Sequence, residues 1–268
     1  MLNKAVILCG GNGTRFLPIT KVFPKEMLPI INRPVLEYLL KECKDAGIND
    51  VLIIINRRKD MMKKYFEKDE FFDNLIGKQD FEDMNITFEY QGEKKGTGGA
   101  LLVAKEFACG EDIAVMFGDD YFVGGALKEL KDVYEETPKD ILGVKICDTD
   151  DITKYGVMVG RELDGSLMEC TGIKEKPSID DLPSRRYFVG RAILKGDIFA
   201  RLENIPLVSG EYRLTDALDD FLAVTLKASR YDLGSKQGYI KAMIYHGLHS
   251  EWKDEIKEFI KEQLEDEK

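Results

Sequence analysis

The chain has 268 residues, of which 44% are hydrophobic, and this is enough for one large domain with a buried core. Its formal net charge is −10 without any basic block, which argues against nucleic acid or an anionic membrane surface as a partner. No apolar run approaches the roughly 18 residues of a membrane span, and the first apolar run is too short for a signal peptide, so we expect a cytoplasmic protein.

The first half of the chain alternates apolar runs with amphipathic stretches, which is typical of a parallel sheet covered by helices on both faces. The expected strands are 4–9, 51–55, 86–90, 113–117 and 141–146. The expected helices lie at about 34–47, 58–68, 98–108 and 124–136. Ligands collect at the carboxyl ends of such strands, so the segments after strands 4–9 and 113–117 are expected to meet in one crevice.

After residue 150 the pattern indicates an antiparallel lobe inserted into a continuation of the sheet. Asp164-Gly165 is a hairpin signal between two expected strands, 156–161 and 167–175. The remaining expected elements are strands at 186–194 and 229–232 and helices at about 197–203, 214–226, 235–246 and 251–265. No linker or repeat interrupts the chain, so we expect a single domain over residues 1–268.

Cysteine and histidine offer little chemistry. The five cysteines are scattered and odd in number, which indicates buried free thiols in a reducing compartment. The two histidines, His246 and His249, have no acidic or cysteine partner nearby in sequence, so they do not predict a metal site.

A glycine-rich turn at 10–13 follows the first expected strand, and Arg15, Lys21 and Lys25 come next. Glycines let backbone N–H groups approach phosphate oxygens, and cations neutralise them. The turn lacks the Gly-x-x-x-x-Gly-Lys pattern, and Phe16 replaces the third glycine of a Gly-x-Gly-x-x-Gly fingerprint, which counts against a nicotinamide dehydrogenase. The glycines alone fit a tight turn equally well, and the cations favour a phosphate site.

Carboxylates follow two other expected strands. Asp119 and Asp120 end the strand at 113–117, and Asp232 ends the strand at 229–232 before a glycine and a helix start. Mg²⁺ prefers carboxylate oxygens together with water and substrate phosphates, so these residues are candidate metal ligands. Turn formation or helix capping explains each aspartate as well when it is taken alone.

Two weaker motifs complete the set. Glu175-Lys176-Pro177 follows a strand, where the lysine can hold a second anion. Gln91 precedes the glycine loop at 96–99, where its amide can read the edge of a base. A plain strand-to-helix loop accounts for the second motif equally well.

Taken together, these motifs resemble the sugar-1-phosphate nucleotidyltransferases over nearly the whole chain. Residues 11–30 resemble the family signature, and the part from Pro24 to Ile30 resembles its bacterial uridylyltransferase branch. Two segments depart from that branch: residues 96–100 read Gly-Thr-Gly-Gly-Ala where Gly-Leu-Gly-His-Ala is common, and residues 117–120 read Phe-Gly-Asp-Asp, closer to the thymidylyl branch.

The resemblance implies a Rossmann-like α/β fold: a mostly parallel mixed sheet flanked by helices, a small antiparallel sugar-binding lobe and C-terminal helices. It implies a nucleotide-binding half at 1–145, a sugar-phosphate-binding half at 146–234 and C-terminal helices at 235–268. It assigns catalysis to Arg15 and Lys25, and Mg²⁺ binding to Asp119 and Asp232. The implied nucleotide contacts are Gly10, Gly11, Gly13, Thr14, Gln91, Gly96 and Asp120. The implied sugar-phosphate contacts are Tyr155, Gly156, Glu175, Lys176, Gly190 and Glu211.

The implied reaction joins UTP and glucose 1-phosphate to give UDP-glucose and pyrophosphate, in a homo-oligomer such as a dimer or tetramer. The sugar phosphate is already ionised at neutral pH, so no general base is needed, in agreement with the scarcity of histidine. The alternatives are the same chemistry with dTTP or another sugar 1-phosphate, and an inactive regulatory subunit. The cations and carboxylates expected of an active enzyme are all present, which counts against the latter.

Overall fold

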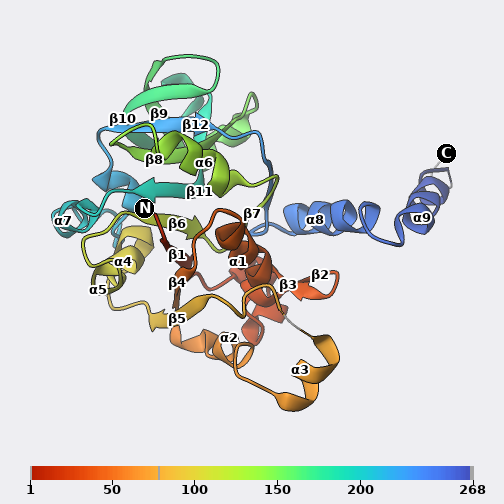
Figure 1. Cartoon of the computed structure of the whole chain (residues 1–268). Coiled ribbons are helices and arrows are strands. Elements are labelled where there is room, and N and C mark those ends of the chain that lie inside the picture. The colour runs from red at the N-terminus through yellow and green to blue at the C-terminus, as the bar shows by residue number, and fades with distance from the viewer. Residues whose placement is uncertain (1, 78, 266–268) are drawn as a thin grey trace.

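The computed structural model describes residues 2–77 and 79–265, and within them one mixed sheet of nine strands forms the centre of the molecule (Figure 1). The strand order is β5-β4-β1-β6-β11-β8-β12-β10-β9. The strands of this sheet are β1 (Lys4–Cys9), β4 (Asp50–Ile55), β5 (Asn85–Tyr90), β6 (Ile113–Phe117), β8 (Asp140–Ile146), β9 (Gly156–Glu162), β10 (Leu167–Glu175), β11 (Arg186–Leu194) and β12 (Phe221–Thr225). Two small antiparallel sheets pair β2 (Pro29–Ile30) with β3 (Arg33–Pro34) and β7 (Asp120–Val123) with β13 (Ser229–Asp232).

The predicted parallel strands are confirmed. Strand β1 runs parallel to β4 and β6, with Ala5 opposite Val51 and Ala114, and β4 runs parallel to β5. Their apolar runs are long because both faces of β1 and β4 are buried. The carboxyl ends of these strands therefore lie at one edge of the sheet, which we call the carboxyl edge.

Helices cover both faces, as expected. Helices α1 and α6 pack on one face of the sheet and contribute apolar side chains to one core cluster. Helices α4 and α7 pack on the other face and contribute to a second core cluster. The helix bounds are α1 (Val35–Asp45), α2 (Met61–Lys64), α3 (Glu70–Ile76), α4 (Gly96–Leu102), α5 (Lys105–Ala108), α6 (Ala126–Tyr134), α7 (Ile198–Glu203), α8 (Lys236–Leu248) and α9 (Lys253–Glu265). The helices predicted at 58–68 and 98–108 are each broken into shorter pieces.

The second half forms the predicted antiparallel lobe, in which β10 pairs with β9 through the hairpin at Asp164 and β11 pairs with β6 and β8. The helix predicted at 214–226 is wrong. Residues Leu214–Ala217 form one 3₁₀ turn, and β12 then inserts between β8 and β10. A short apolar run fits a buried strand and a buried helix equally well. Here the segment forms a strand because it pairs with β8 on one side and β10 on the other.

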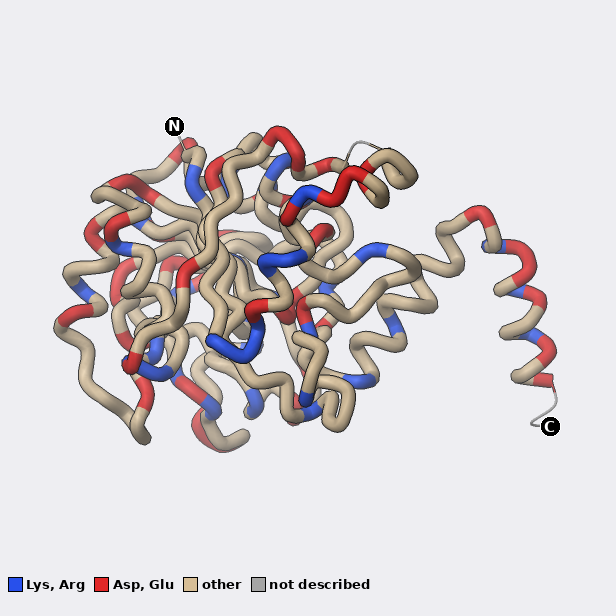
Figure 2. Tube along the Cα trace, turned by 90° about the horizontal axis from the view of Figure 1, so that it is seen from below, with Lys and Arg blue, Asp and Glu red and all other residues tan. Residues whose placement is uncertain are grey.

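The C-terminal helices α8 and α9 project from the body as an arm (Figure 1), and acidic and basic residues alternate along α9 (Figure 2). Residues 266–268, the end of the predicted C-terminal segment, lie outside the described residues. No helix among the described residues is long and apolar enough to cross a membrane. The expectation of buried thiols holds for three cysteines and is wrong for Cys109, which is exposed, and for Cys147, which is partly exposed.

Candidate active site

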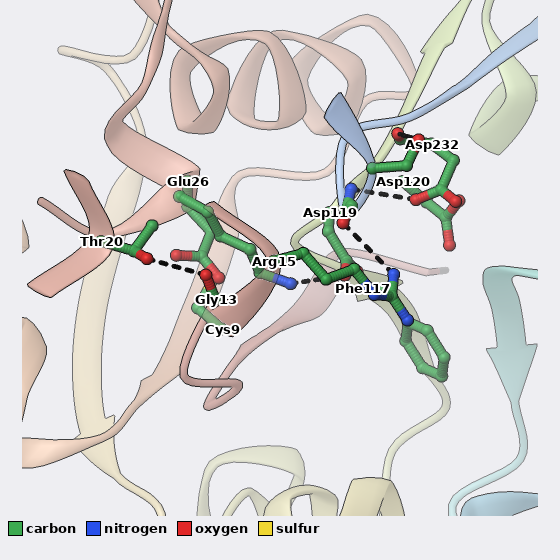
Figure 3. A network of polar contacts seen from close by, with 12 residues as sticks. Cys9, Gly13, Arg15, Thr20, Glu26, Phe117, Asp119, Asp120 and Asp232 are labelled. Carbon is green, nitrogen blue, oxygen red and sulfur yellow. Dashed lines mark hydrogen bonds and ion pairs between the residues drawn. The ribbon is translucent and has the colours of Figure 1, made fainter. Parts of the chain in front are cut away.

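Three segments that are distant in sequence meet at the carboxyl edge. The glycine turn follows β1, Asp119 follows β6, and Asp232 ends β13, where it lies opposite Asp120 in the β13–β7 pair. Figure 3 shows Arg15, Asp119, Asp120 and Asp232 gathered in this region, with Gly13 beside them. The segments after β1 and β6, which were predicted to meet, therefore do lie together at this edge.

The glycine turn is held open by polar contacts on its protein side. Gly13 has a φ of 66°, a left-handed conformation that favours glycine, and its carbonyl accepts a hydrogen bond of 2.7 Å from the Thr20 hydroxyl (Figure 3). Asn56, which follows β4, donates to the Gly10 carbonyl at 2.8 Å. These contacts fix the carbonyls of Gly10 and Gly13 on the protein, while Gly11 and Thr14 stay exposed.

Lys25 and Asp119 form an ion pair at the carboxyl edge. Burial alone would raise the pKa of Asp119, but the charge of Lys25 and its hydrogen bond outweigh burial and hold that pKa below its ordinary value. Burial lowers the pKa of Lys25, and the charges of Asp119 and Glu26 more than reverse this. Both groups are therefore ionised at neutral pH.

Glu26 and Lys59 form a second, fully buried pair behind the first. Lys59 Nζ donates to both Glu26 oxygens, at 2.8 and 2.7 Å, and to the Cys9 carbonyl at 2.6 Å. The pair thus ties the start of the glycine turn to the segment that carries Lys25. Burial raises the pKa of Glu26, although the charges of Lys59 and Lys25 oppose that rise.

The carboxylates of Asp119 and Asp232 point toward one small volume beside Gly234. A methyl group placed on that glycine would lie 2.9 Å from Asp119 Oδ2, 3.0 Å from Asp232 Oδ1 and 3.2 Å from Arg15 Nη1. No cluster of three or more potential metal ligands occurs among the described residues. Two carboxylates fit Mg²⁺, which usually binds one or two of them and completes its shell with phosphate and water oxygens.

Asp120 is buried, and its two carboxylate oxygens lie beside Arg230 and Gly190. It forms an ion pair with Arg230, whose guanidinium also lies 5.4 Å from the ring centre of Tyr155 and 5.6 Å from that of Tyr187. Burial raises the pKa of Asp120 to about 6, with Arg230 opposing and Asp119 adding to that rise. A methyl group on Gly190 would lie 2.5 Å from Asp120 Oδ2, so only a glycine lets β11 approach this carboxylate. Asp120 therefore lies between the Asp119–Asp232 pair and Gly190, one of the predicted sugar contacts.

The predicted sugar-phosphate residues come from four segments: Tyr155 and Gly156 at the start of β9, Glu175 and Lys176 at the end of β10, Gly190 in β11, and Glu211 in the loop after α7. Lys176 is exposed and has a φ of 46°, and its amide donates to the Tyr155 carbonyl at 3.0 Å. The adjacent Glu175 accepts a hydrogen bond of 2.8 Å from Thr215. Among the described residues no hydrogen bond or ion pair engages the Lys176 ammonium group, so it is available to an external anion.

The predicted base loop packs directly against the glycine turn. Gln91 Nε2 donates to the carbonyls of Lys94 and Gly96, and a methyl group on Gly10 would lie 2.0 Å from Gln91 Oε1. The Tyr212 carbonyl accepts from the Gly98 amide at 2.9 Å. The loop therefore bridges the glycine turn and the segment that carries Glu211, which is exposed beside it.

Sequence reasoning missed the residues that support this edge from behind. Arg230 pairs with Asp120, Lys59 pairs with Glu26, and Arg191 pairs with Glu42, all with little or no exposure of the basic side chain. For Arg191 a signal existed, since it is a charged residue inside the otherwise apolar strand sequence of β11.

The chain belongs to the nucleotidyl transferase family: the family model "Nucleotidyl transferase" matches residues 4–263. A UTP–glucose-1-phosphate uridylyltransferase of Mycoplasma pneumoniae is 35% identical over 97% of this chain and 98% of its own length. One of Bacillus subtilis is 38% identical over 92% of this chain and 90% of its own.

Solved structures agree with the fold. A UDP-glucose pyrophosphorylase complexed with UDP-glucose superposes with a TM-score of 0.87 at 31% identity, covering 93% of this chain and 100% of that one. A UTP-bound enzyme of Acinetobacter baumannii gives a TM-score of 0.88 at 29% identity, covering 97% and 99%. The predicted family and α/β fold are thereby confirmed.

Proposed function

We propose that this protein transfers the uridylyl group of UTP to glucose 1-phosphate and releases pyrophosphate, making UDP-glucose. The observation that carries the proposal is the convergence of the glycine turn, Lys25, Asp119 and Asp232 at one edge of the sheet. That edge suits a nucleoside triphosphate, and the names of the full-length relatives identify the nucleotide and sugar.

Asp119 and Asp232 would hold Mg²⁺, which when bound neutralises phosphate charge. The glycine turn would wrap the triphosphate through Gly10, Gly11, Gly13 and Thr14. Arg15 is exposed beside Gly234, where its guanidinium can reach the same phosphates. Before substrate binds, the ion pair with Asp119 holds the Lys25 ammonium group in position. When substrate is bound, Lys25 would direct some of its N–H donors to the reacting phosphates.

The sugar phosphate would bind opposite the nucleotide, with Lys176 on its phosphate. Tyr155, Gly156, Glu175, Gly190 and Glu211 would contact the sugar. Gln91 and Gly96 would contact the base, and Asp120 would add a further contact to the nucleotide. One phosphate oxygen of the sugar then attacks the α-phosphorus, the bond from that phosphorus to the bridging oxygen breaks, and pyrophosphate carries away the electron pair. The protein residues would position the substrates and neutralise their charge, and none would form a covalent intermediate.

Pyrophosphate release measured with a panel of triphosphates and sugar 1-phosphates tests the assignment. We expect UTP with glucose 1-phosphate to give the highest kcat/KM. A higher value with dTTP would replace the uridylyl reaction by the thymidylyl reaction, and a higher value with N-acetylglucosamine 1-phosphate would change the sugar. No release with any pair would contradict the proposed enzyme class.

We also propose the division into a nucleotide-binding half (1–145), a sugar-phosphate-binding half (146–234) and C-terminal helices (235–268) within one cytoplasmic protein. The nine-stranded sheet that spans both halves supports one domain, and the absence of disulfides among its cysteines fits the cytoplasm.

Finally, we propose a homo-oligomer, a dimer or tetramer, in which the C-terminal arm contacts a second copy. The arm exposes Ile240, Phe259 and Leu264, and an apolar groove of about 650 Å³ lies at its base, lined in part by Leu17 and Ile19. Light scattering after size-exclusion chromatography tests it. Phe259→Glu should give monomers, and an unchanged mass would remove the arm from the interface.

A further inference from the structure

Arg191 is the largest side chain among those with almost no exposure, and its surroundings are unusual for an arginine. Its Nε and Nη2 donate to the two oxygens of Glu42, at 3.1 and 2.9 Å. Glu42 itself lies on α1 and also accepts from the Leu127 amide, at 3.0 Å, at the start of α6. The pair therefore joins β11 to two helices.

The remaining donors of Arg191 are directed at main-chain carbonyls. Nη2 donates to the Asp120 carbonyl at 2.6 Å, and Nη1 donates to the carbonyls of Gly190 and Phe117 at 3.1 and 3.4 Å. A guanidinium has five N–H donors, and these contacts use all of them. The face of the group also lies 4.9 Å from the ring centre of Phe122.

The two carbonyls from the β6–β7 connection are not arbitrary. Phe117 and Asp120 flank the turn of Gly118 and Asp119, so one planar group holds the turn at both ends. The turn is also held by hydrogen bonds from the Gly118 amide to the Leu8 carbonyl and from the Leu233 amide to the Asp119 carbonyl. These link it to β1 and to the segment after Asp232. The position of the Asp119 carboxylate relative to Asp232 therefore depends on this turn.

Stability alone does not account for such a pair. A buried ion pair is often no more stabilising than apolar side chains of similar volume, because desolvation offsets the attraction. A planar five-donor group does, however, impose directions on its acceptors that an apolar side chain cannot impose.

We propose that Arg191, fixed by Glu42, is a positioning residue that sets the conformation of the Phe117–Asp120 turn and hence the separation of the carboxylates of Asp119 and Asp232. This inference rests on the proposed function for the role of those carboxylates. Residues that orient metal ligands typically change metal affinity or activity by about 10-fold to 100-fold when they are lost.

The test compares Arg191→Lys, which keeps the charge and loses the planar fork, with Arg186→Lys. Arg186 is a matched control: it is a buried arginine at the first position of β11, bonded to Glu162, Thr225 and the Gly165 carbonyl. Hydrogen–deuterium exchange of the metal-free protein should show faster exchange over residues 117–123 in Arg191→Lys, by about 10-fold, and not in Arg186→Lys.

The second readout is Mn²⁺ binding in the presence of UTP, followed by electron paramagnetic resonance. Arg191→Lys should weaken Mn²⁺ binding by about 10-fold and lower kcat, with the KM for UTP changed less than kcat. Wild-type exchange and Mn²⁺ affinity in a folded Arg191→Lys variant would overturn the proposal. Equal changes in Arg186→Lys would also overturn it, because general loosening would then explain both.

If Arg191→Lys does not fold, the double variant Arg191→Met with Glu42→Leu removes both buried charges together, and it should fold with the same faster exchange of the turn. Normal exchange in the double variant would contradict the positioning role. A failure of the proposed function is distinguishable, because wild-type protein would then make no UDP-glucose while the exchange measurement would still decide the role of Arg191.

Discussion

The two edges of the central sheet carry the same residue types with opposite consequences. We call the opposite edge, where β1, β4 and β6 begin, the amino edge. There Asp112, just before β6, accepts hydrogen bonds from Tyr134, Lys195 and the Gly196 amide, so the protein itself occupies both of its oxygens. At the carboxyl edge, Asp119 has Lys25 as its one side-chain hydrogen-bond partner among the described residues, and its Oδ2 faces the volume beside Gly234. A lysine–aspartate pair is therefore structural where the protein completes its contacts and available for chemistry where it does not.

The largest expected effect is on Mg²⁺-dependent turnover, which should depend on an aspartate at the carboxyl edge and not on one at the amino edge. Asp232→Ala should lower Mg²⁺-dependent turnover by about 10³-fold or more, since charge neutralisation by a bound metal contributes several kcal/mol to the transition state. Asp112→Asn, at the amino edge, should leave turnover near the wild-type value. Steady-state rates over a range of Mg²⁺ concentrations check both variants, and an active, Mg²⁺-dependent Asp232→Ala enzyme would exclude the two-carboxylate site.

The next effect concerns the two lysines. Lys25→Ala should lower kcat by about 10²-fold, the order expected when a preorganised charge-stabilising donor is lost. Lys195→Ala removes the corresponding lysine from Asp112 and should change stability but not kcat. The comparison fails if both variants lose turnover equally, or if Lys25→Ala turns over normally while folded.

A smaller effect is expected on the sugar side, where Lys176 has no hydrogen bond or ion pair to another described side chain. Lys176→Met should raise the KM for glucose 1-phosphate by about 10-fold or more with little change in the KM for UTP. Lys174→Met is the control, because Lys174 lies two residues earlier, on β10, and is ion-paired with Asp181. An increase confined to the KM for UTP would move Lys176 to the nucleotide side.

The sequence could predict the parallel strands and the edge at which their loops meet, but it could not predict every strand of the sheet. Apolar runs such as 4–9 and 113–117 predict parallel strands, and strand direction alone brings the glycine turn and Asp119 to one edge. Local pattern could not predict β12, because its run of four apolar residues does not distinguish strand from helix.

Pairings between distant segments were likewise beyond local pattern. Arg191 meets Glu42, 149 positions away, and Arg230 meets Asp120, 110 positions away. Nothing in the neighbouring residues specifies which charge will be the partner, since that depends on how β11 and β13 are placed in the finished sheet. The sequence could therefore nominate candidate site residues, whose roles stay predictions, whereas the buried charges behind them required the structure.

The smallest effect is a dependence of stability on pH at the amino edge. Burial would raise the pKa of Asp112, but hydrogen bonds from Lys195, Tyr134 and the Gly196 amide outweigh it and lower that pKa below its ordinary value of 3.8. A lowered folded-state pKa contributes stability that is present above the unfolded-state value and is lost as the pH falls toward the folded-state value.

Asp112→Asn should therefore lower the free energy of unfolding at pH 7 by more than it does near pH 3. The charge-dependent part of the difference should be about 1 kcal/mol or less, because the pair is partly exposed to solvent. Urea unfolding at pH 7, 5 and 3 measures it for wild type and variant. A difference that stays constant with pH would mean that Asp112 contributes through packing and neutral hydrogen bonds, and the lysine–aspartate pairs at the two edges would then differ in kind as well as in exposure to ligand.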